Sequence, residues 1–425
     1  MTTREQNDFL TCTGPGTPMG TLVRRYWIPA LLSREVPEPD SPPVRVKLMS
    51  ERLIAFRDSR GRVGVMDEFC AHRGVSLWFA RNEEEGLRCP YHGWKYDVTG
   101  QCVEVPSEPV ESGFCRRIRL KSYPCVELGD VVWIYMGPPE LQPPLPAFEW
   151  TKVAPSHRFV SKRTQECNYL QAMEGGIDSA HVSFLHRHDL RSDALHAGAG
   201  AELTRETEVR FEVVETSGGM IIGVRRPAQA GHVYWRITQW IMPFHTMIPP
   251  YGDNALNGHA WVPIDDESCM AWCFTHHPAR ALSERELDVM RDGGGIHVRL
   301  MPGSFRPVVN KDNDYMMDRA AQRAGKTYCG VAGIAMQDAA IQESMGPIQD
   351  RSKENLVSTD NGVIMARIRL RKAALAVAQG SKPDGIDPAT HAVRSASLVL
   401  PEHVSFIEAT AEALTARAGV AHTSV

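Results

Sequence analysis

Hydrophobic and polar positions change their spacing along the chain, and the change predicts two regions of different structure. Between residues 43 and 135, short apolar runs alternate with turn sequences such as DSRGR and DVTGQ. The runs VRVKLMS, RLIAFRD, VGVMDEF and VVWIYMG are rich in β-branched and aromatic residues, which suit a pleated surface. This part of the chain is therefore predicted to form a small all-β domain.

A proline-rich stretch, GPPELQPPLPAFEW, follows at about residues 137–150 and is typical of a linker. After it, residues 160–190 have a helical pattern, residues 205–275 return to strands, and the remainder is mostly helical. Ser283 and Glu286 have capping-box spacing at the start of one of these helices. The predicted fold class is α+β, with an all-β domain in residues 1–150 and a larger domain with an antiparallel sheet in residues 151–425.

Composition and charge limit which partners and which cellular compartment we expect for the chain. The chain has 425 residues, and its net charge of −4 comes with no basic stripe, which argues against a nucleic-acid partner. The N-terminus lacks the apolar segment of a secretory signal, and no run approaches the roughly 18 apolar residues of a membrane span. We expect a cytoplasmic protein, in which the ten cysteines serve as free thiols or metal ligands rather than disulfides.

One group of potential metal ligands lies in the predicted β domain. Cys70 and His72 are separated by one residue, and Cys89 and His92 follow with two residues between them. A structural zinc site of Cys₂His₂ type is one interpretation, although zinc fingers usually pair Cys with Cys and His with His. Here each loop offers one Cys and one His, which favours a [2Fe–2S] cluster with one iron on two thiolates and the other on two imidazoles, the Rieske arrangement.

A second group lies in the stretch GGIDSAHVSFLHRHD, which contains Asp178, His181, His186 and His188. Positions 181 and 186 are about 140° apart on a regular helix, so the chain must bend or end between them if both bind one metal. The alternative is a helix with one buried and two exposed histidines. Two histidines and one carboxylate form the facial triad of iron(II) oxygenases, and the carboxylate could be Asp178 or a distant residue. His188 has no role that we can assign.

The motif CAHRG…CPYHGW resembles the Rieske domain of bacterial Rieske non-heme iron oxygenases. The resemblance implies a [2Fe–2S] cluster, mononuclear iron(II) and a helix-grip-like catalytic domain with an antiparallel sheet after the Rieske domain. The pattern D-x-x-H-x-x-x-x-H at 178–186, with QD shortly before GPIQDR, is similar to the phthalate-dioxygenase-type branch. It implies that His181, His186 and Asp338 bind iron. Other acids, Asp350 and Asp360, lie in turn-like sequences.

The same resemblance implies the partners. Asp178 would connect a Rieske histidine of a neighbouring subunit to an iron-ligand histidine, which requires a ring, at least a homotrimer, with a stacked-trimer hexamer as the larger form. No G-x-G-x-x-G motif opens a βαβ unit, so electrons would come from another protein. The resemblance implies that this protein is an NAD(P)H-dependent reductase with a flavin and a plant-type [2Fe–2S] cluster.

Candidate substrate residues are less sharply defined by the sequence. Arg236 lies on an apolar strand face with Tyr234 and Trp240, where it could anchor a carboxylate or form an internal salt bridge. Ser179 could reach the same carboxylate. Asn168 is a candidate active-site residue, with ordinary helix polarity as its alternative.

These observations predict a terminal oxygenase that uses O₂ to hydroxylate an aromatic carboxylate such as a phthalate or substituted benzoate, most simply by cis-dihydroxylation. A monooxygenase or O-demethylase of a methoxy- or phenoxy-arene acid is the alternative, because the same metals serve both reactions. A Rieske electron carrier without oxygenase activity is the alternative from another class, but it would need only the first domain.

Overall fold

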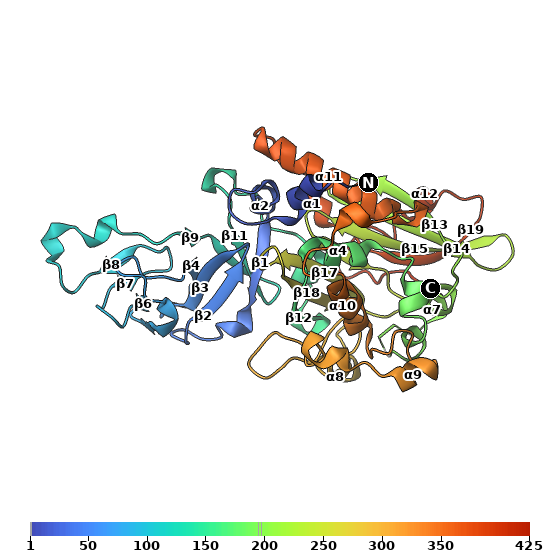
Figure 1. Cartoon of the computed structure of the whole chain (residues 1–425), viewed down its shortest axis with the longest axis horizontal. Helices are drawn as coiled ribbons and strands as arrows, with labels where there is room; N and C mark the ends of the chain where they lie inside the picture. Colours follow the sequence, from blue (N-terminus) through green and yellow to red (C-terminus); the bar gives the residue numbers. More distant parts are fainter. Residues whose placement is uncertain (1, 194, 197) are drawn as a thin grey trace. The chain divides into compact units, whose positions relative to one another are not determined.

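The computed structural model describes residues 2–193, 195–196 and 198–425, and the chain forms two compact units (Figure 1). The smaller unit comprises residues 14–16 and 23–143, and the larger one comprises residues up to 13, 17–22 and 144–425. The expected boundary at residue 150 thus moves to 143, and the N-terminal segment joins the larger unit. The N-terminal segment belongs to the larger unit because its first helix is hydrogen-bonded there. The carbonyl of Leu10 accepts from the hydroxyl of Tyr169, and the carbonyl of Thr11 accepts from the side chain of Asn168.

The smaller unit is built from short antiparallel strands, as the sequence predicted. Three sheets have the strand orders β1-β11-β10, β2-β3-β4-β9 and β5-β6-β7-β8. The strands are β1 (Trp27–Leu32), β2 (Val44–Leu48), β3 (Glu51–Arg57), β4 (Val63–Asp67), β5 (Arg81–Glu83), β6 (Gly86–Arg88), β7 (Lys95–Tyr96), β8 (Cys102–Glu104), β9 (Ser122–Tyr123), β10 (Cys125–Leu128) and β11 (Val131–Tyr135).

The larger unit contains an antiparallel sheet with the order β12-β18-β17-β16-β15-β14-β13, and β19 pairs with β15. Its strands are β12 (Arg158–Gln165), β13 (Arg210–Glu215), β14 (Gly219–Pro227), β15 (His232–Ile241), β16 (His245–Ile248), β17 (Leu256–Pro263), β18 (Cys269–His276) and β19 (Ala396–Pro401). The helical prediction for residues 160–165 is wrong. This segment carries buried polar side chains without clear alternation, and its pairing with β18 makes it a strand.

Helices cover one part of this sheet. The helices are α1 (Arg4–Thr11), α2 (Pro18–Val23), α3 (Glu149–Lys152), α4 (Tyr169–Ile177), α5 (Val182–Leu185), α6 (Asp189–Ser192), α7 (Ala199–Leu203), α8 (Glu284–Arg291), α9 (Arg319–Arg323), α10 (Ile334–Ser344), α11 (Asn361–Ala378) and α12 (Phe406–Thr410). Helix α4 packs on β15, β16 and β17, and α10 packs on α4 (Figure 1). Helix α8 begins with the predicted capping box of Ser283 and Glu286.

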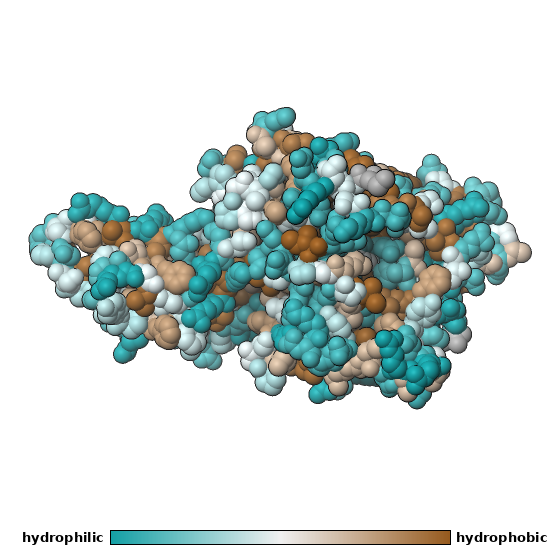
Figure 2. Space-filling model, viewed as in Figure 1, coloured by the Kyte–Doolittle hydropathy of each residue, from teal (hydrophilic) through white to brown (hydrophobic). Residues whose placement is uncertain are grey.

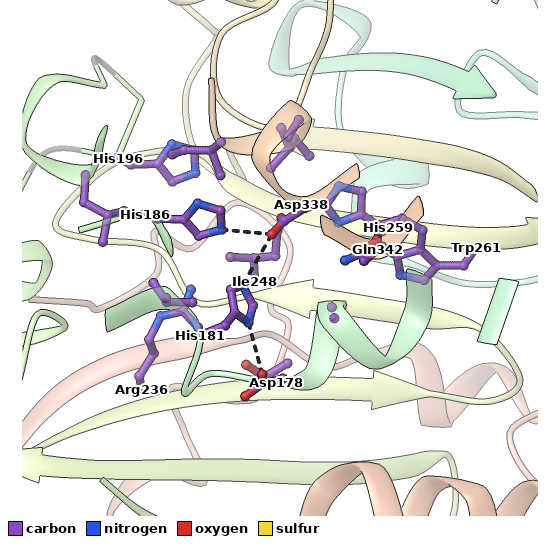
Figure 3. Close-up of a pocket in the computed structure, with 18 of the residues that line it drawn as sticks. Asp178, His181, His186, His196, Arg236, Ile248, His259, Trp261, Asp338 and Gln342 are labelled. Carbon is purple, nitrogen blue, oxygen red and sulfur yellow. Dashed lines mark hydrogen bonds and ion pairs between the residues drawn. The ribbon is translucent and has the colours of Figure 1, made fainter. Parts of the chain in front are cut away.

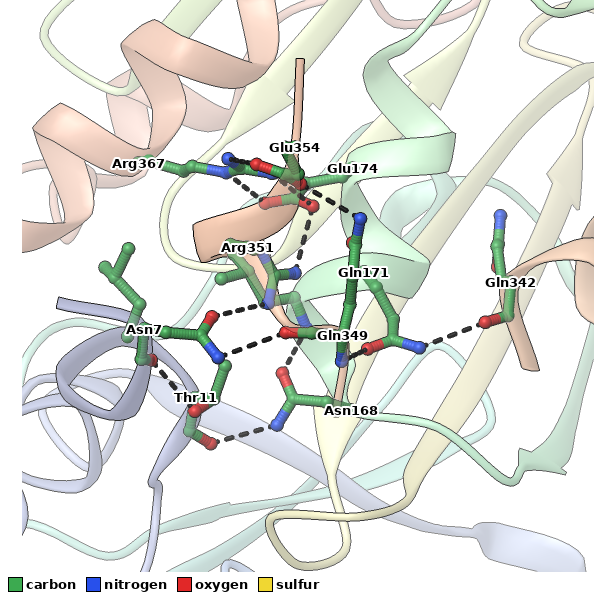
Figure 4. A network of polar contacts seen from close by, with 12 residues as sticks. Asn7, Thr11, Asn168, Gln171, Glu174, Gln342, Gln349, Arg351, Glu354 and Arg367 are labelled. Carbon is green, nitrogen blue, oxygen red and sulfur yellow. Dashed lines mark hydrogen bonds and ion pairs between the residues drawn. The ribbon is translucent and has the colours of Figure 1, made fainter. Parts of the chain in front are cut away.

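A buried polar network fixes helix α4 in place (Figure 4). The carboxylate of Glu174 accepts hydrogen bonds from Arg351 at 3.0 Å and from Arg367 at 2.6 and 3.0 Å. Burial raises the pKa of Glu174, but the two guanidinium groups outweigh burial and lower it below its usual value. Because breaking one partner of a buried ion pair is costly, the network holds α4 against the segments that carry Arg351 and Arg367.

On the face seen in Figure 2, hydrophobic and hydrophilic side chains are interspersed. Among the described residues, none of the helices is at once long enough and apolar enough to span a membrane.

Candidate metal centres and substrate pocket

Two loops of the smaller unit repeat the same backbone geometry around a cysteine. The carbonyl of Cys70 accepts from the N–H of Gly74 at 2.9 Å, and that of Cys89 accepts from the N–H of Gly93 at 3.0 Å. Each cysteine N–H then donates to the carbonyl of the residue after the glycine. The two glycines have φ of 72° and 77°, in the left-handed region that favours glycine. The sequence therefore builds two matched turns, each presenting one Cys and one His.

The two kinds of donor differ in exposure. Cys70 and Cys89 are 3% and 2% exposed, whereas His72 and His92 are exposed and their rings lie 4.5 Å apart. The hydroxyl of Tyr96 accepts from the N–H of Ala71 at 3.1 Å and lies 3.2 Å from the Cys70 sulfur. When the sulfur is a thiolate, which has no proton to give, the hydroxyl donates its own proton to the sulfur. The site thus has buried thiols and outward imidazoles.

This arrangement discriminates between one metal and a cluster. Ligands of a single tetrahedral zinc lie close together, because each is about 2.0–2.3 Å from the metal. Within the described part of the chain, two groups of three His, Cys, Asp or Glu donors lie within 4.8 Å of one another, and neither includes Cys70, His72, Cys89 or His92. The larger spread of these four donors fits two irons better than one zinc.

The second site forms where the chain breaks between two helices. Helix α4 ends at Ile177, Asp178 is its C-cap, and the four-residue helix α5 begins after His181 and ends before His186. This break brings the two imidazole rings to within 5.2 Å, which a continuous helix would not do. Asp338, on α10, points between them (Figure 3). Its Oδ1 lies 3.0 Å from His186 Nε2 and 3.5 Å from His181 Nε2.

Outer contacts set the tautomers of both histidines. His186 Nδ1 lies 2.8 Å from Oε1 of Gln337, whose amide nitrogen is committed to Asp189 and to the carbonyl of Val331. His181 Nδ1 lies 3.3 Å from Oδ2 of Asp178. In both rings Nδ1 therefore carries a proton, and both Nε2 atoms face Asp338. This is the arrangement that metal-binding histidines adopt, with a second group orienting each ring.

The charges of the group are strongly coupled. Burial lowers the pKa of His181, but hydrogen bonds to Asp178 and Asp338 outweigh burial and raise it to about 10. Burial raises the pKa of Asp338, yet the neighbouring histidines hold it far below its usual range. The pKa of Asp178 is lowered in the same way, mainly by His181 against the effect of burial. Without a metal, a proton links these groups, so a divalent cation has to displace it.

The three converging side chains line a larger pocket, between Arg236 on one side and His259 and Trp261 on the other (Figure 3). Its empty space is about 680 Å³, counting the open mouth, and its walls also include Arg236, Tyr251 and Trp261. Arg236 is 7% exposed and donates to Oγ of Ser179 at 3.2 Å and to the hydroxyl of Tyr251 at 3.4 Å. Among the described residues it forms no salt bridge, so the predicted alternative of an internal ion pair is not observed.

Asn168, a predicted active-site residue, lies outside the pocket. Asn168 is the N-cap of α4: its side chain accepts from the N–H of Leu170 and donates to the carbonyls of Thr11 and Asp266. It does not line the pocket, so its assignment as an active-site residue is wrong, and its polarity serves the helix terminus. Asp350 and Asp360 also cap turns, as expected. His188 stacks on Tyr328 with ring centroids 6.5 Å apart.

Several residues that line the pocket or orient the triad were missed by sequence reasoning. Gln337 immediately precedes Asp338, so its neighbour could have drawn attention to it. Arg163 and His259 lie on β12 and β17 and line the pocket, but nothing in their local sequence distinguishes them from ordinary polar strand residues. Tyr251 follows a Pro-Pro pair in a loop, where its contact with Arg236 depends on the tertiary fold.

Comparisons with known proteins agree with this division. Residues 26–124 match the Rieske [2Fe-2S] domain, and residues 134–414 match the family described as LigXa C-terminal domain like. The chain is 38% identical to the 3-chlorobenzoate-3,4-dioxygenase oxygenase subunit of Comamonas testosteroni, covering 92% of this chain and 93% of that protein. It is 39% identical to the phthalate 4,5-dioxygenase oxygenase subunit of Pseudomonas putida, covering 90% of this chain and 88% of that protein.

A solved structure gives the same fold. Dicamba monooxygenase bound to dicamba superposes with a TM-score of 0.58 at 19% identity, covering 84% of this chain and 99% of that chain. Two matched domains and two relatives of nearly full length therefore assign the family. The chain belongs to the Rieske non-heme iron oxygenases, oxidoreductases that combine a Rieske [2Fe–2S] cluster with a non-heme iron.

Proposed function

We propose that this chain is the terminal oxygenase of a multicomponent system that hydroxylates an aromatic carboxylate. Cys70 and Cys89 would hold one iron of the cluster, and His72 and His92 the other. His181, His186 and Asp338 would hold the mononuclear iron. The observation that carries the proposal is the presence, in one pocket, of this triad and of a buried arginine without a carboxylate partner.

The triad fits iron(II) by its donor chemistry. Two neutral imidazoles and one carboxylate leave positions open on the metal, and iron bound there supplies the binding and reductive activation of O₂. The protein contributes orientation: Gln337 and Asp178 hold the two rings by their Nδ1 protons. The pocket walls, including Val182, Ile248 and Ile334, limit the access of water to the reacting ring.

Arg236 supports an acidic substrate. A buried guanidinium is costly without a counter-charge, and its planar pair of N–H groups suits a carboxylate. Ser179 and Tyr251 hold Arg236 with neutral oxygens, which leaves its positive charge for a ligand. Two relatives are named for aromatic acids, 3-chlorobenzoate and phthalate. We therefore propose a benzoate- or phthalate-type substrate whose carboxylate binds Arg236 and Ser179, with the ring in the part of the pocket next to His181, His186 and Asp338.

We also propose the electron route and the assembly. Asp178 is 29% exposed on its side chain and already accepts from His181, so its remaining surface can meet a Rieske histidine of a neighbouring subunit. This role requires a homotrimer or a hexamer of stacked trimers. The electron donor would be an NAD(P)H-dependent reductase with flavin and a plant-type [2Fe–2S] cluster. A cytoplasmic location stays a prediction.

Product analysis tests this function. The holoenzyme, supplied with a reductase and a panel of aromatic acids under ¹⁸O₂, is expected to yield a cis-dihydrodiol with two labelled oxygens. A single labelled oxygen, or release of formaldehyde from a methoxy substrate, would replace dihydroxylation by monooxygenation or O-demethylation. No oxygenated product from any aromatic acid would reject the proposal.

O-demethylation remains the second candidate because of one relative. The chain is 31% identical to the 5,5'-dehydrodivanillate O-demethylase oxygenase subunit of Sphingobium sp., over 92% of this chain and 85% of that protein. Because the metals are the same for both outcomes, the difference lies in which substrate atom faces the iron.

A further inference from the structure

A second arginine of the pocket lacks a counter-charge. Arg163, on β12, is 1% exposed and lines the pocket. Its contacts are to neutral atoms and are long: the Cys273 sulfur and the Ile296 carbonyl at 3.4 Å, and the Gln165 side-chain oxygen at 3.3 Å. Its Nε has no hydrogen-bond partner. Good N–H···O bonds are about 2.9 Å long, so this buried cation is poorly satisfied by the protein.

Other buried arginines of the same unit show the contrast. Three outside the pocket have carboxylates at short distances: Arg394 bonds Glu149 at 2.8 Å, Arg367 bonds Glu174 at 2.6 Å, and Arg351 bonds Glu174 at 3.0 Å. Arg226 has no carboxylate partner among the described residues, but it donates a short hydrogen bond of 2.7 Å to the carbonyl of Ser179. The carboxyl of Glu343 interacts electrostatically with Arg163, but it accepts from Tyr315 and from the N–H of Glu166 instead. Within the described chain, Arg163 has no salt bridge. It therefore keeps a charge that a ligand can neutralise.

His259 adds a polar side chain at the same end of the pocket. Its ring stacks on Trp261, its Nδ1 has no partner, and it lines the pocket (Figure 3). Burial and the charge of Arg163 lower its pKa to about 3, so the imidazole is neutral and can donate one hydrogen bond. Strand register puts His259 opposite Cys273, whose sulfur contacts Arg163, so both polar groups rise from the same sheet face.

This pair and Arg236 come from separated strands. β12 and β15 are four positions apart in the sheet, which places their backbones up to roughly 19 Å apart at about 4.8 Å per strand. Thr246 on β16 faces His259, and Trp240 on β15 faces Thr246, so this register keeps Arg236 on the same face. Both guanidiniums line one pocket, which also holds Asp338, so the pocket has one unpaired arginine toward each end.

We propose that Arg163 and His259 form a second anion-binding subsite, so that the substrate is an aromatic acid with a second acidic group across the ring, meta or para to the first. This inference deepens the proposed function and rests on it, because Arg236 holds the first carboxylate. Arg163 supplies charge and a free Nε–H, and His259 supplies a neutral donor. A ligand bridging the two ends keeps its ring beside the metal-binding triad and fixes which ring edge faces it.

Binding to the intact holoenzyme without reductase tests the subsite. Isothermal titration calorimetry gives Kd for two matched pairs: benzene-1,4-dicarboxylate with 4-nitrobenzoate, and benzene-1,3-dicarboxylate with 3-nitrobenzoate. Each nitro acid has the shape of its diacid but one charge fewer. We expect the diacid of at least one pair to bind about tenfold or more tightly, as a charge-assisted bond predicts. Equal affinities in both pairs would overturn the subsite.

Variants separate this inference from the first anchor. Arg163→Gln should reduce the preference to within about threefold while leaving the nitro acid almost unchanged, and an equal loss for both members would overturn the subsite. Should Arg163→Gln fail to fold, His259→Phe, which keeps the ring stack, is expected to lower the preference severalfold; an unchanged preference contradicts it. Arg236→Gln should weaken all four acids together, and if it does not, the proposed carboxylate anchor fails independently of Arg163.

Discussion

His186 donates from Nδ1 to the side-chain oxygen of Gln337 at 2.8 Å, and the next residue of the same helix, Asp338, faces its other nitrogen at 3.0 Å. One turn of α10 therefore supplies both an orienting partner and a proposed co-ligand. Gln337 is 0% exposed, and its amide nitrogen is held by Asp189 and Val331, so its oxygen cannot rotate away. The ring is fixed before any metal binds.

Removing this acceptor should weaken iron binding. Gln337→Met fills similar space but cannot accept the Nδ1 proton, and loss of such an orienting group typically costs about 10–100-fold in metal affinity. Competition with a chelator measures the Kd of the mononuclear iron, and the EPR signal of the cluster serves as the internal control. Equal iron retention in Gln337→Met would show that the contact does not orient His186.

Asp178 is expected to matter for electron transfer and not for metal loading. Asp178→Asn keeps the size of the side chain and an oxygen that can accept the Nδ1 proton of His181, but it removes the negative charge. Both metal centres should persist, while oxidation of the reduced cluster in a single turnover with substrate and O₂ slows by about 10-fold or more, because a proposed contact between two imidazoles is weakened. Asp350→Asn, a change at an exposed cap, is the matched control and should turn over normally. Full turnover in Asp178→Asn would reject the bridge.

Iron binding should release a proton. The pKa of His181 in the metal-free chain is raised to about 10, so at neutral pH its proton occupies the triad and must leave when the metal takes Nε2. Calorimetry in buffers of different ionisation enthalpy should therefore count about one proton per iron at pH 7.5, and the apparent affinity should rise about tenfold per pH unit between pH 7 and 9. Affinity that stays constant over this range would contradict a shared proton at His181.

The cluster potential should depend on Tyr96. Its hydroxyl accepts from Ala71 and faces the Cys70 sulfur at 3.2 Å, so with a thiolate present it donates to sulfur and stabilises the reduced cluster. Tyr96→Phe should lower the reduction potential by about 40 mV, corresponding to roughly 1 kcal/mol for one hydrogen bond. Protein-film voltammetry measures this shift, with Tyr91→Phe, an exposed neighbour of His92, as the control. An unchanged reduction potential in Tyr96→Phe would show that the hydroxyl does not stabilise the reduced cluster.

Site residues that are close together in the sequence could be predicted, whereas those defined by tertiary contacts could not. The Cys70–His72 and Cys89–His92 pairs are local, so their turns and glycines could be recognised in the sequence. The need for a chain break between His181 and His186 followed from helix geometry alone. Arg163 could not be identified as a candidate from the sequence, because its lack of a carboxylate partner is visible only in the folded structure. The helical prediction fails in β12 because strand pairing, and not alternation, buries the polar side chains of this strand.

Asn168 shows the opposite error. A polar residue near a predicted metal motif can face the metal or cap the helix that carries the motif, and the sequence does not separate these roles. In the structure its side chain bonds three backbone groups at the start of α4. Gln171 likewise bonds the backbone of residues 342, 346 and 349, and thus ties α4 to the segment after α10.

Iron content of Asp338→Ala tests the two-centre account most directly. The wild-type holoenzyme should contain about three irons per chain, two in the cluster and one mononuclear. Asp338→Ala should contain about two, with an unchanged EPR signal of low average g after reduction, and Asp360→Ala should keep all three. A variant that retains its mononuclear iron, or that loses the cluster as well, would contradict the assignment of His181, His186 and Asp338.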